Sequence, residues 1–213
     1  MTREVKEAAP EIKGQRLKRA LDHLTQADRD LARVIDEIGP PPPRGEPPGF
    51  AALLGIIVSQ QVSNGAAQAI WARLEAALDG EPTPKRLWAL DEEVLRAAGL
   101  SRQKVIYARG LADEILSGRL DLAAVARLPD DDVIAALTQV KGIGRWSAEI
   151  YLLFALNRPD VMPANDLALV LSAQRLKRLR VRPSPERLLR LAEPWRPWRS
   201  VAARLLWHYY RTF

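Results

Sequence analysis

The chain has 213 residues, 32 of them basic and 26 acidic, and a net charge of +6 at pH 7. It has no cysteine and only two histidines, which excludes disulfides, zinc–thiolate sites, iron–sulfur clusters, cysteine nucleophiles and a multi-histidine metal site. A hydrophobic content of 47% excludes a disordered chain, and no uncharged apolar run reaches the length of about 18 residues that a transmembrane helix needs. The N-terminal sequence MTREVKEAAP lacks the apolar run of a signal peptide, so we expect a cytoplasmic protein.

Helices are predicted along almost the whole chain. The first spans 15–38, and the proline-rich segment Gly39–Gly49 that follows predicts a stiff, extended linker. The next helix, Phe50–Val58, is apolar nearly all round, as a fully buried helix would be. Further helices are predicted over 66–78, 84–98, 102–117, 121–127, 130–139, 146–157, 167–179, 185–192 and 198–211. Because no run alternates between apolar and polar residues as a strand would, we expect an all-α fold.

Positive charge is concentrated near the C-terminus. Residues 167–213 carry ten arginines, Lys177 and two glutamates, a net charge of +9, whereas residues 1–166 carry a net charge of −3. A basic quarter on a near-neutral body indicates a polyanionic partner. The alternative is an arginine-rich helix face that only meets solvent.

The segment 137–156 indicates a nucleic-acid contact. Gly142 and Gly144 bracket one apolar residue between two predicted helices, and glycine permits a tight hairpin because it tolerates positive φ. Ile143 would then point into the core. The N–H groups at the start of the second helix would face outward and could hold a phosphate without reading sequence. The alternative is a purely structural helix–turn–helix corner.

The loop after this segment carries a candidate catalytic carboxylate. Residues 158–171 (RPDVMPANDLALVL) deliver Asn165 and Asp166 to the start of an apolar helix. An aspartate in this position is commonly a helix N-cap. If the hairpin holds DNA, Asp166 has a second use, because it could face a positive charge that develops on a sugar.

Together these segments resemble the helix–hairpin–helix DNA glycosylase superfamily, in which the hairpin is followed about twenty residues later by an aspartate. The resemblance rests on VKGIGRWSAEI (140–150), PANDLAL (163–169), IVSQQVS (57–63) and WRPWRSVAARLLW (195–207). The last two resemble AlkA-like alkylpurine glycosylases of the DNA-3-methyladenine glycosylase II type, in the compact form that lacks an N-terminal β-containing domain.

The resemblance implies an all-α fold of two helical lobes, with an active-site cleft between them. Lobe one would comprise 15–50 and about 160–213, and lobe two about 51–159, including the hairpin 137–150.

The resemblance also implies a monofunctional enzyme, that is, a glycosylase without lyase activity. Relatives with lyase activity carry a nucleophilic lysine two residues after the second hairpin glycine, where this chain has Trp146, and Lys141 does not match that position.

The implied reaction is hydrolysis of the N-glycosidic bond of alkylated purines, of the 3-methyladenine and 7-methylguanine type, in base excision repair. After base flipping, Asp166 would stabilise the oxocarbenium-like sugar. Trp146 and Trp207 match pocket positions of the family, and Ile150 stands where relatives have tyrosine. Trp71, Trp88, Trp195 and Trp198 are expected in the core.

The residues expected at DNA include Gln60 and Gln61 of the wedge loop, with Gln61 filling the space left by the flipped base. A polar helix break is the alternative for this pair. The hairpin residues expected at DNA are Gly142, Gly144, Arg145 and Ser147. Ser101, at the start of another predicted helix, is also expected at DNA, and its alternative is a plain N-cap.

No cofactor is expected to be required, although the family hairpin can bind sodium or potassium through main-chain carbonyls, here those of Thr138, Val140 and Gly142. The expected partner is double-stranded DNA with alkylated bases. We expect a monomer that is associated with the nucleoid of a bacterial-type cell and does not contact a membrane. Two alternatives stay open: a glycosylase for another damaged or mismatched base, and a helix–hairpin–helix module that binds DNA without catalysis.

Overall fold

The computed structural model describes residues 11–213, and this part of the chain is helical without a strand. The predicted all-α class is therefore confirmed. No helix among these residues is long and apolar enough to span a membrane. The N-terminal sequence from which we expected no signal peptide lies outside the described residues.

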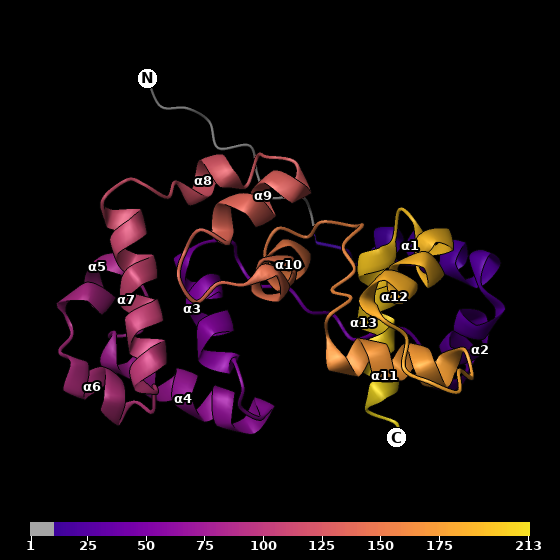
Figure 1. Ribbon diagram of the computed structural model, residues 1–213, viewed down its shortest axis with the longest axis horizontal. Coiled ribbons are helices and arrows are strands. Elements are labelled where there is room, and N and C mark those ends of the chain that lie inside the picture. Colours follow the sequence, from indigo (N-terminus) through magenta and orange to yellow (C-terminus); the bar gives the residue numbers. More distant parts are fainter. Residues whose placement is uncertain (1–10) are drawn as a thin grey trace. The chain divides into compact units, whose positions relative to one another are not determined.

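The described chain divides into two compact units. The first is the continuous segment Glu46–Leu156. Its helices, labelled in Figure 1, are α3 (Phe50–Ser59), α4 (Asn64–Ala77), α5 (Pro84–Ala89), α6 (Glu92–Ala97), α7 (Arg102–Leu116), α8 (Leu122–Val125), α9 (Asp130–Leu137) and α10 (Arg145–Phe154).

Helix α3 forms the centre of this first unit, where it packs against α4, α7 and α10. Leu53, Leu54 and Ile57 are all at most 1% exposed, whereas Ala51 and Gly55, one turn apart on another face of α3, are partly exposed. Neighbouring helices therefore cover most of the surface of α3, as a helix that is apolar nearly all round requires. The prediction of a buried helix over Phe50–Val58 is therefore confirmed for most of its residues and wrong at Ala51 and Gly55.

The second unit joins the segment that ends at Gly45 with Asn157–Phe213. Its elements are α1 (Gly14–Ala27), α2 (Arg29–Ile38), α11 (Leu167–Leu176), α12 (Pro185–Leu191), a 3₁₀ turn η1 (Glu193–Trp195) and α13 (Arg199–Tyr210). Helices α11 and α13 pack side by side (Figure 1).

The predicted single helix over 15–38 is wrong, because Asp28 ends α1 and starts α2. The backbone of Asp28 is extended, and its carboxylate accepts from the N–H groups of Asp30 and Leu31, as an N-cap does. The same carboxylate is 2.6 Å from Lys177 Nζ and 2.7 Å from Trp195 Nε1. Burial favours a raised pKa for Asp28, but these two donors outweigh it and lower the pKa.

A buried arginine ties the proline-rich segment to α13. Arg204 is 6% exposed, and its guanidinium donates to the carbonyl oxygens of Ile12 and Pro42. Pro42 belongs to the predicted linker, which is non-helical as expected. This part of the linker is therefore held against its own unit by Arg204.

Of the four tryptophans expected in the core, Trp195 is fully buried and donates to Asp28, so that prediction is confirmed. Trp88 is 48% exposed, so the prediction is wrong there. Trp71 and Trp198 are half-buried. The short helix α5 leaves one side of Trp88 in solvent because this helix packs mainly on α7.

Candidate active site and nucleic-acid interface

The hairpin between α9 and α10 forms as predicted. Ile143 is 4% exposed, and its N–H donates to the carbonyl oxygen of Val140 at 3.0 Å. Gly142 has a φ of 94°, which a residue with a side chain rarely adopts. The apolar residue between the two glycines therefore fixes the turn to the core of its unit.

The two hairpin glycines have different reasons to be glycine. A Cβ on Gly142 would overlap the ring of Tyr107 on α7. Gly144 has an ordinary φ of −88°, and a Cβ there would meet no described atom within 4 Å. Gly144 is the N-cap of α10, and no side chain caps this helix. The start of α10 therefore presents backbone N–H groups, the donors that bind anions at helix N-termini.

Arg145, in the first turn of α10, is oriented by a buried acid. Its Nε donates to Oε1 of Glu149 at 2.9 Å, and the Arg145 side chain is 59% exposed whereas that of Glu149 is 6% exposed. The second oxygen of Glu149 is buried and has no hydrogen-bond partner among residues 11–213. Burial raises the pKa of Glu149 despite the ion pair with Arg145. The guanidinium is thus held at the hairpin while most of it faces solvent.

The loop after α3 is joined to this hairpin by Gln60. Its Nε2 donates to the carbonyl oxygen of Gly142 at 2.8 Å and lies 3.3 Å from Oγ of Ser147. Ser147 is 3% exposed, so its hydroxyl faces the protein. Gln61, by contrast, is exposed and has a φ of 55°. The two glutamines therefore differ: the Gln60 amide bonds inside the protein, and Gln61 stands at the surface of the loop.

Two residues of α7 that the sequence did not single out contact the same region. Lys104 is 8% exposed, and its Nζ donates to the carbonyl oxygen of Val58 at 2.7 Å. Burial lowers the pKa of Lys104. Tyr107, one turn later, packs on Gly142. Ser101, which the sequence did single out, caps α7 through its hydroxyl, which accepts from the N–H of Lys104 at 3.2 Å.

Asp166 lies at the start of α11 in the second unit. Its Oδ1 accepts from the N–H of Leu169 at 3.0 Å and from Nε1 of Trp207 at 3.1 Å. Asp166 is therefore the N-cap of α11, the structural role that we considered for it, and it is half-buried. Because Trp207 comes from α13, the packing of α11 on α13 sets the orientation of this carboxylate.

The remaining predicted pocket residues are on α10. Ile150 is 8% exposed, and Trp146 is half-buried. The predicted cleft between the lobes and the pocket roles of these residues stay predictions.

Two of the three main-chain carbonyls expected to bind a monovalent cation, those of Val140 and Gly142, accept hydrogen bonds within the protein. The Val140 oxygen accepts from Ile143, and the Gly142 oxygen accepts from Gln60. The predicted sodium or potassium site stays a prediction. Among the described residues, no cluster of histidine, aspartate and glutamate could hold a metal ion.

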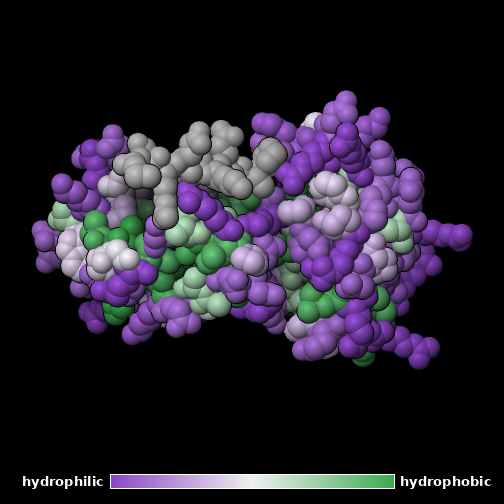
Figure 2. Space-filling view, turned by 90° about the horizontal axis from the view of Figure 1, so that it is seen from above, coloured by the Kyte–Doolittle hydropathy of each residue, from purple (hydrophilic) through white to green (hydrophobic). Residues whose placement is uncertain are grey.

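The arginines of the basic C-terminal quarter fall into two groups. Arg196 and Arg199 pair with Asp160, and Arg204 is the buried residue described above. The other seven are exposed and form no ion pair within the described residues: Arg175, Arg178, Arg180, Arg182, Arg187, Arg190 and Arg211. Most of the surface visible in Figure 2 is hydrophilic, and uncompensated arginines on such a surface favour a polyanion.

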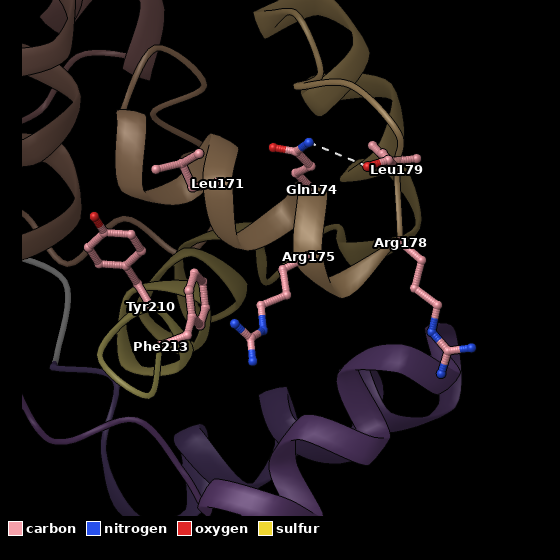
Figure 3. Close-up of a pocket in the computed structure, with 7 residues that line it drawn as sticks. All are labelled: Leu171, Gln174, Arg175, Arg178, Leu179, Tyr210 and Phe213. Carbon is pink, nitrogen blue, oxygen red and sulfur yellow. Dashed lines mark hydrogen bonds between the residues drawn. The ribbon is translucent and has the colours of Figure 1, made fainter.

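Two of these arginines line a groove of about 640 Å³ between the end of α11 and the C-terminus (Figure 3). The guanidinium of Arg175 is 4.3 Å from the ring centroid of Phe213, and the amide of Gln174 donates to the Leu179 carbonyl. None of the predicted site residues lines this groove.

Comparisons with known proteins agree with this arrangement. Residues 54–197 match the family described as HhH-GPD superfamily base excision DNA repair protein. The chain is 36% identical over 199 residues to DNA-3-methyladenine glycosylase 1 of Schizosaccharomyces pombe, covering 90% of this chain and 86% of that protein.

Two solved structures are similar over nearly the whole chain. One is a 3-methyladenine DNA glycosylase from S. pombe in complex with abasic DNA, with a TM-score of 0.82, 34% identity and coverage of 89% of this chain and 95% of that one. The other is a DNA-3-methyladenine glycosidase from Bacillus halodurans, with a TM-score of 0.79, 32% identity and coverage of 96% and 93%. The chain therefore belongs to the HhH-GPD superfamily of base excision DNA repair proteins, in the family of the DNA-3-methyladenine glycosylases.

Proposed function

We propose that the protein is a monofunctional DNA glycosylase of the 3-methyladenine glycosylase II type, which releases alkylated purines such as 3-methyladenine and 7-methylguanine from duplex DNA. The observation that carries this proposal is the Asp166 carboxylate, which two N–H donors from Leu169 and Trp207 hold in one orientation. The names of the relatives support the choice of alkylated purines.

The reaction breaks the bond between the base nitrogen and C1′ of the sugar, and water adds to C1′. An alkylated purine already carries positive charge, so it takes the bonding electron pair and leaves as a neutral base without a strong general acid. Positive charge meanwhile develops on the sugar, and the fixed carboxylate of Asp166 stabilises it and orients the attacking water. The water proton passes to solvent.

The hairpin provides the DNA anchor in this proposal. The N–H groups around Gly142, Gly144 and Ser147 bind a phosphate, and the exposed guanidinium of Arg145 adds a charged donor. Since the Ser147 hydroxyl is buried, Ser147 would contact DNA through its backbone. The start of α7 at Ser101 is a second phosphate contact, and sodium or potassium at the hairpin carbonyls would attract a phosphate by its charge.

The base leaves the stack before it reacts, and Gln61 fills the vacated space. The electron-rich faces of Trp146 and Trp207 bind the cationic base, and the apolar Ile150 side chain completes the pocket. Unstacking costs least at a damaged pair, which contributes to the selection of alkylated bases.

The identity of the residue at position 146 and the contact of Lys104 support the proposal that the enzyme has no lyase activity. Trp146 stands where a nucleophilic lysine would be required, and the buried Lys104 amine donates to Val58 and cannot reach substrate without breaking that bond. We further propose that the protein works as a monomer on nucleoid DNA in the cytoplasm of a bacterial-type cell, which light scattering and fluorescence of a tagged protein would test.

Base release from methylated duplex DNA tests the proposal, with the released bases separated by chromatography. Asp166→Asn keeps the cap acceptor but removes the charge, so it should lower the release rate by about 10²- to 10³-fold and preserve DNA binding. Asp121→Asn is the matched control, since Asp121 caps α8 through the N–H groups of Ala123 and Ala124.

Full activity of Asp166→Asn would remove Asp166 from its proposed role. If the unmodified protein binds DNA but releases no alkylated base, the alkylpurine assignment fails. The same assay on mismatched and oxidised substrates then separates a glycosylase of different specificity from a module that only binds DNA.

A further inference from the structure

We propose that Gln60 is a positioning residue that couples the DNA-anchoring hairpin to the loop that carries Gln61. This inference rests on the proposed function, because it assigns a role within the base-flipping step. It differs from a direct DNA contact, since the Gln60 amide is occupied inside the protein.

The coupling contact is direct and short. The Gln60 amide donates to the Gly142 carbonyl at 2.8 Å and lies 3.3 Å from the hydroxyl of Ser147, so one side chain bonds to both sides of the turn into α10. The two partners are 82 and 87 positions away in sequence. Gln60 is the residue immediately before Gln61, so any shift of the hairpin displaces the backbone that presents Gln61.

Helix α7 restrains both ends of the same connection. Lys104 donates to Val58 at the end of α3, two residues before Gln60. Tyr107 packs on Gly142, the residue whose carbonyl Gln60 binds. The end of α3 and the hairpin therefore rest on adjacent turns of one helix, and Gln60 connects them directly.

The remaining side of the loop is also fixed. Ser63 caps α4, accepting from the N–H of Ala66 at 3.3 Å. Between Gln60 and Ser63, Gln61 is exposed with a φ of 55°, in the left-handed region. Because this loop is held at both ends, it presents the exposed Gln61 side chain in a fixed position relative to the hairpin. This geometry would let the hairpin bind a phosphate while Gln61 occupies the space left by the flipped base.

The test replaces Gln60 with methionine, which keeps the length of the side chain and removes its N–H groups. Gln68→Met, at an exposed position of α4, is the matched control. Base flipping is read from the fluorescence of 2-aminopurine, which rises when its stacking partner leaves, and anchoring is read from the affinity for undamaged duplex. We expect Gln60→Met to lower the flipping equilibrium about three- to tenfold while the affinity for undamaged duplex stays within about twofold.

The coupling is measured by a double-mutant cycle with Gln61→Ala. If Gln60 acts by positioning Gln61, its substitution adds little once the Gln61 side chain is gone, so the combined loss in flipping stays close to that of Gln61→Ala alone. A merely structural role of Gln60 would lower the thermal midpoint and leave the two losses additive. Additive losses, or unchanged flipping in Gln60→Met, would overturn the inference.

Gln60→Glu covers the case in which the methionine variant fails to fold. Glutamate can still accept from the Ser147 hydroxyl but has no N–H for the Gly142 carbonyl, so the same loss in flipping is expected, and normal flipping overturns the inference. Because flipping is measured by fluorescence without base release, failure of the coupling can be distinguished from failure of the proposed function.

Discussion

Gly144→Asp separates the DNA-anchoring role of the hairpin from its structural role, because the substitution should lower DNA affinity without lowering the stability of the protein. The φ of −88° and ψ of 174° at Gly144 are accessible to any residue, and a Cβ there meets no described atom within 4 Å. Aspartate is also at least as good an N-cap as glycine, so α10 should be stabilised by a few tenths of a kcal/mol, about the difference between these caps. The thermal midpoint should therefore stay or rise slightly.

DNA affinity should fall in the same variant. A carboxylate about 6 Å from a phosphate is repelled by about 0.7 kcal/mol at the dielectric constant of water and about 2.8 kcal/mol at an effective value of about 20. This range corresponds to a loss of about 3- to 100-fold in affinity for every duplex, damaged or not. Fluorescence anisotropy at two salt concentrations measures the loss, which should shrink as salt screens the charges.

Gly144→Ser is the control for the Gly144→Asp experiment. Serine adds a side chain and a cap of similar quality without the charge, so its affinity should stay near that of the unmodified protein. If the aspartate and serine variants bind undamaged duplex equally well at low salt, the start of α10 does not hold a phosphate, and the anchor must lie elsewhere.

Three further predictions concern the carboxylates and lysines of the chain. Trp207→Phe removes the N–H donated to Asp166 and should slow single-turnover base release about tenfold, whereas Trp88→Phe, at an exposed tryptophan, should leave it unchanged. Borohydride treatment during reaction should trap no covalent adduct with DNA, and a trapped adduct would show a nucleophilic lysine. Because burial raises the pKa of Glu149 above 4.5, wild-type stability should increase as pH falls from neutrality through that raised pKa. Glu149→Gln should therefore gain more in urea midpoint at pH 7.5 than at pH 4.5, and equal gains would show that Glu149 does not titrate differently on folding.

Local chemistry explains why the hairpin could be predicted from sequence. A positive φ at Gly142 and a buried Ile143 both follow from residues within the turn itself. The start of α11 is similar, because an aspartate before an apolar helix predicts an N-cap, which is what Asp166 forms. The pattern at Asp166 does not distinguish an N-cap from a catalytic group, however, since the same carboxylate can serve both purposes.

Features that depend on distant partners could not be predicted in this way. At the helix break, Asp28 caps α2 locally, but its carboxylate is also bound by Lys177 and Trp195, which are 149 and 167 positions later in the chain. The bond from Gln60 to Gly142 is of the same kind, because both residues look like surface groups of their own motifs. A sequence motif reflects the residues within it and carries no information about the side chains that join it to another motif.

The basic C-terminal quarter shows the same limit for electrostatics. Composition gives a net charge of +9 for residues 167–213 but does not tell which arginines are neutralised. Asp160, which lies just before this segment, pairs with Arg196 and Arg199, and Arg204 is buried on backbone carbonyls. The charge that can attract DNA over a distance therefore comes from the seven exposed arginines that form no ion pair within the described residues. Substitutions of these arginines should change the salt dependence of binding, while substitutions of Arg199 or Arg204 should change stability.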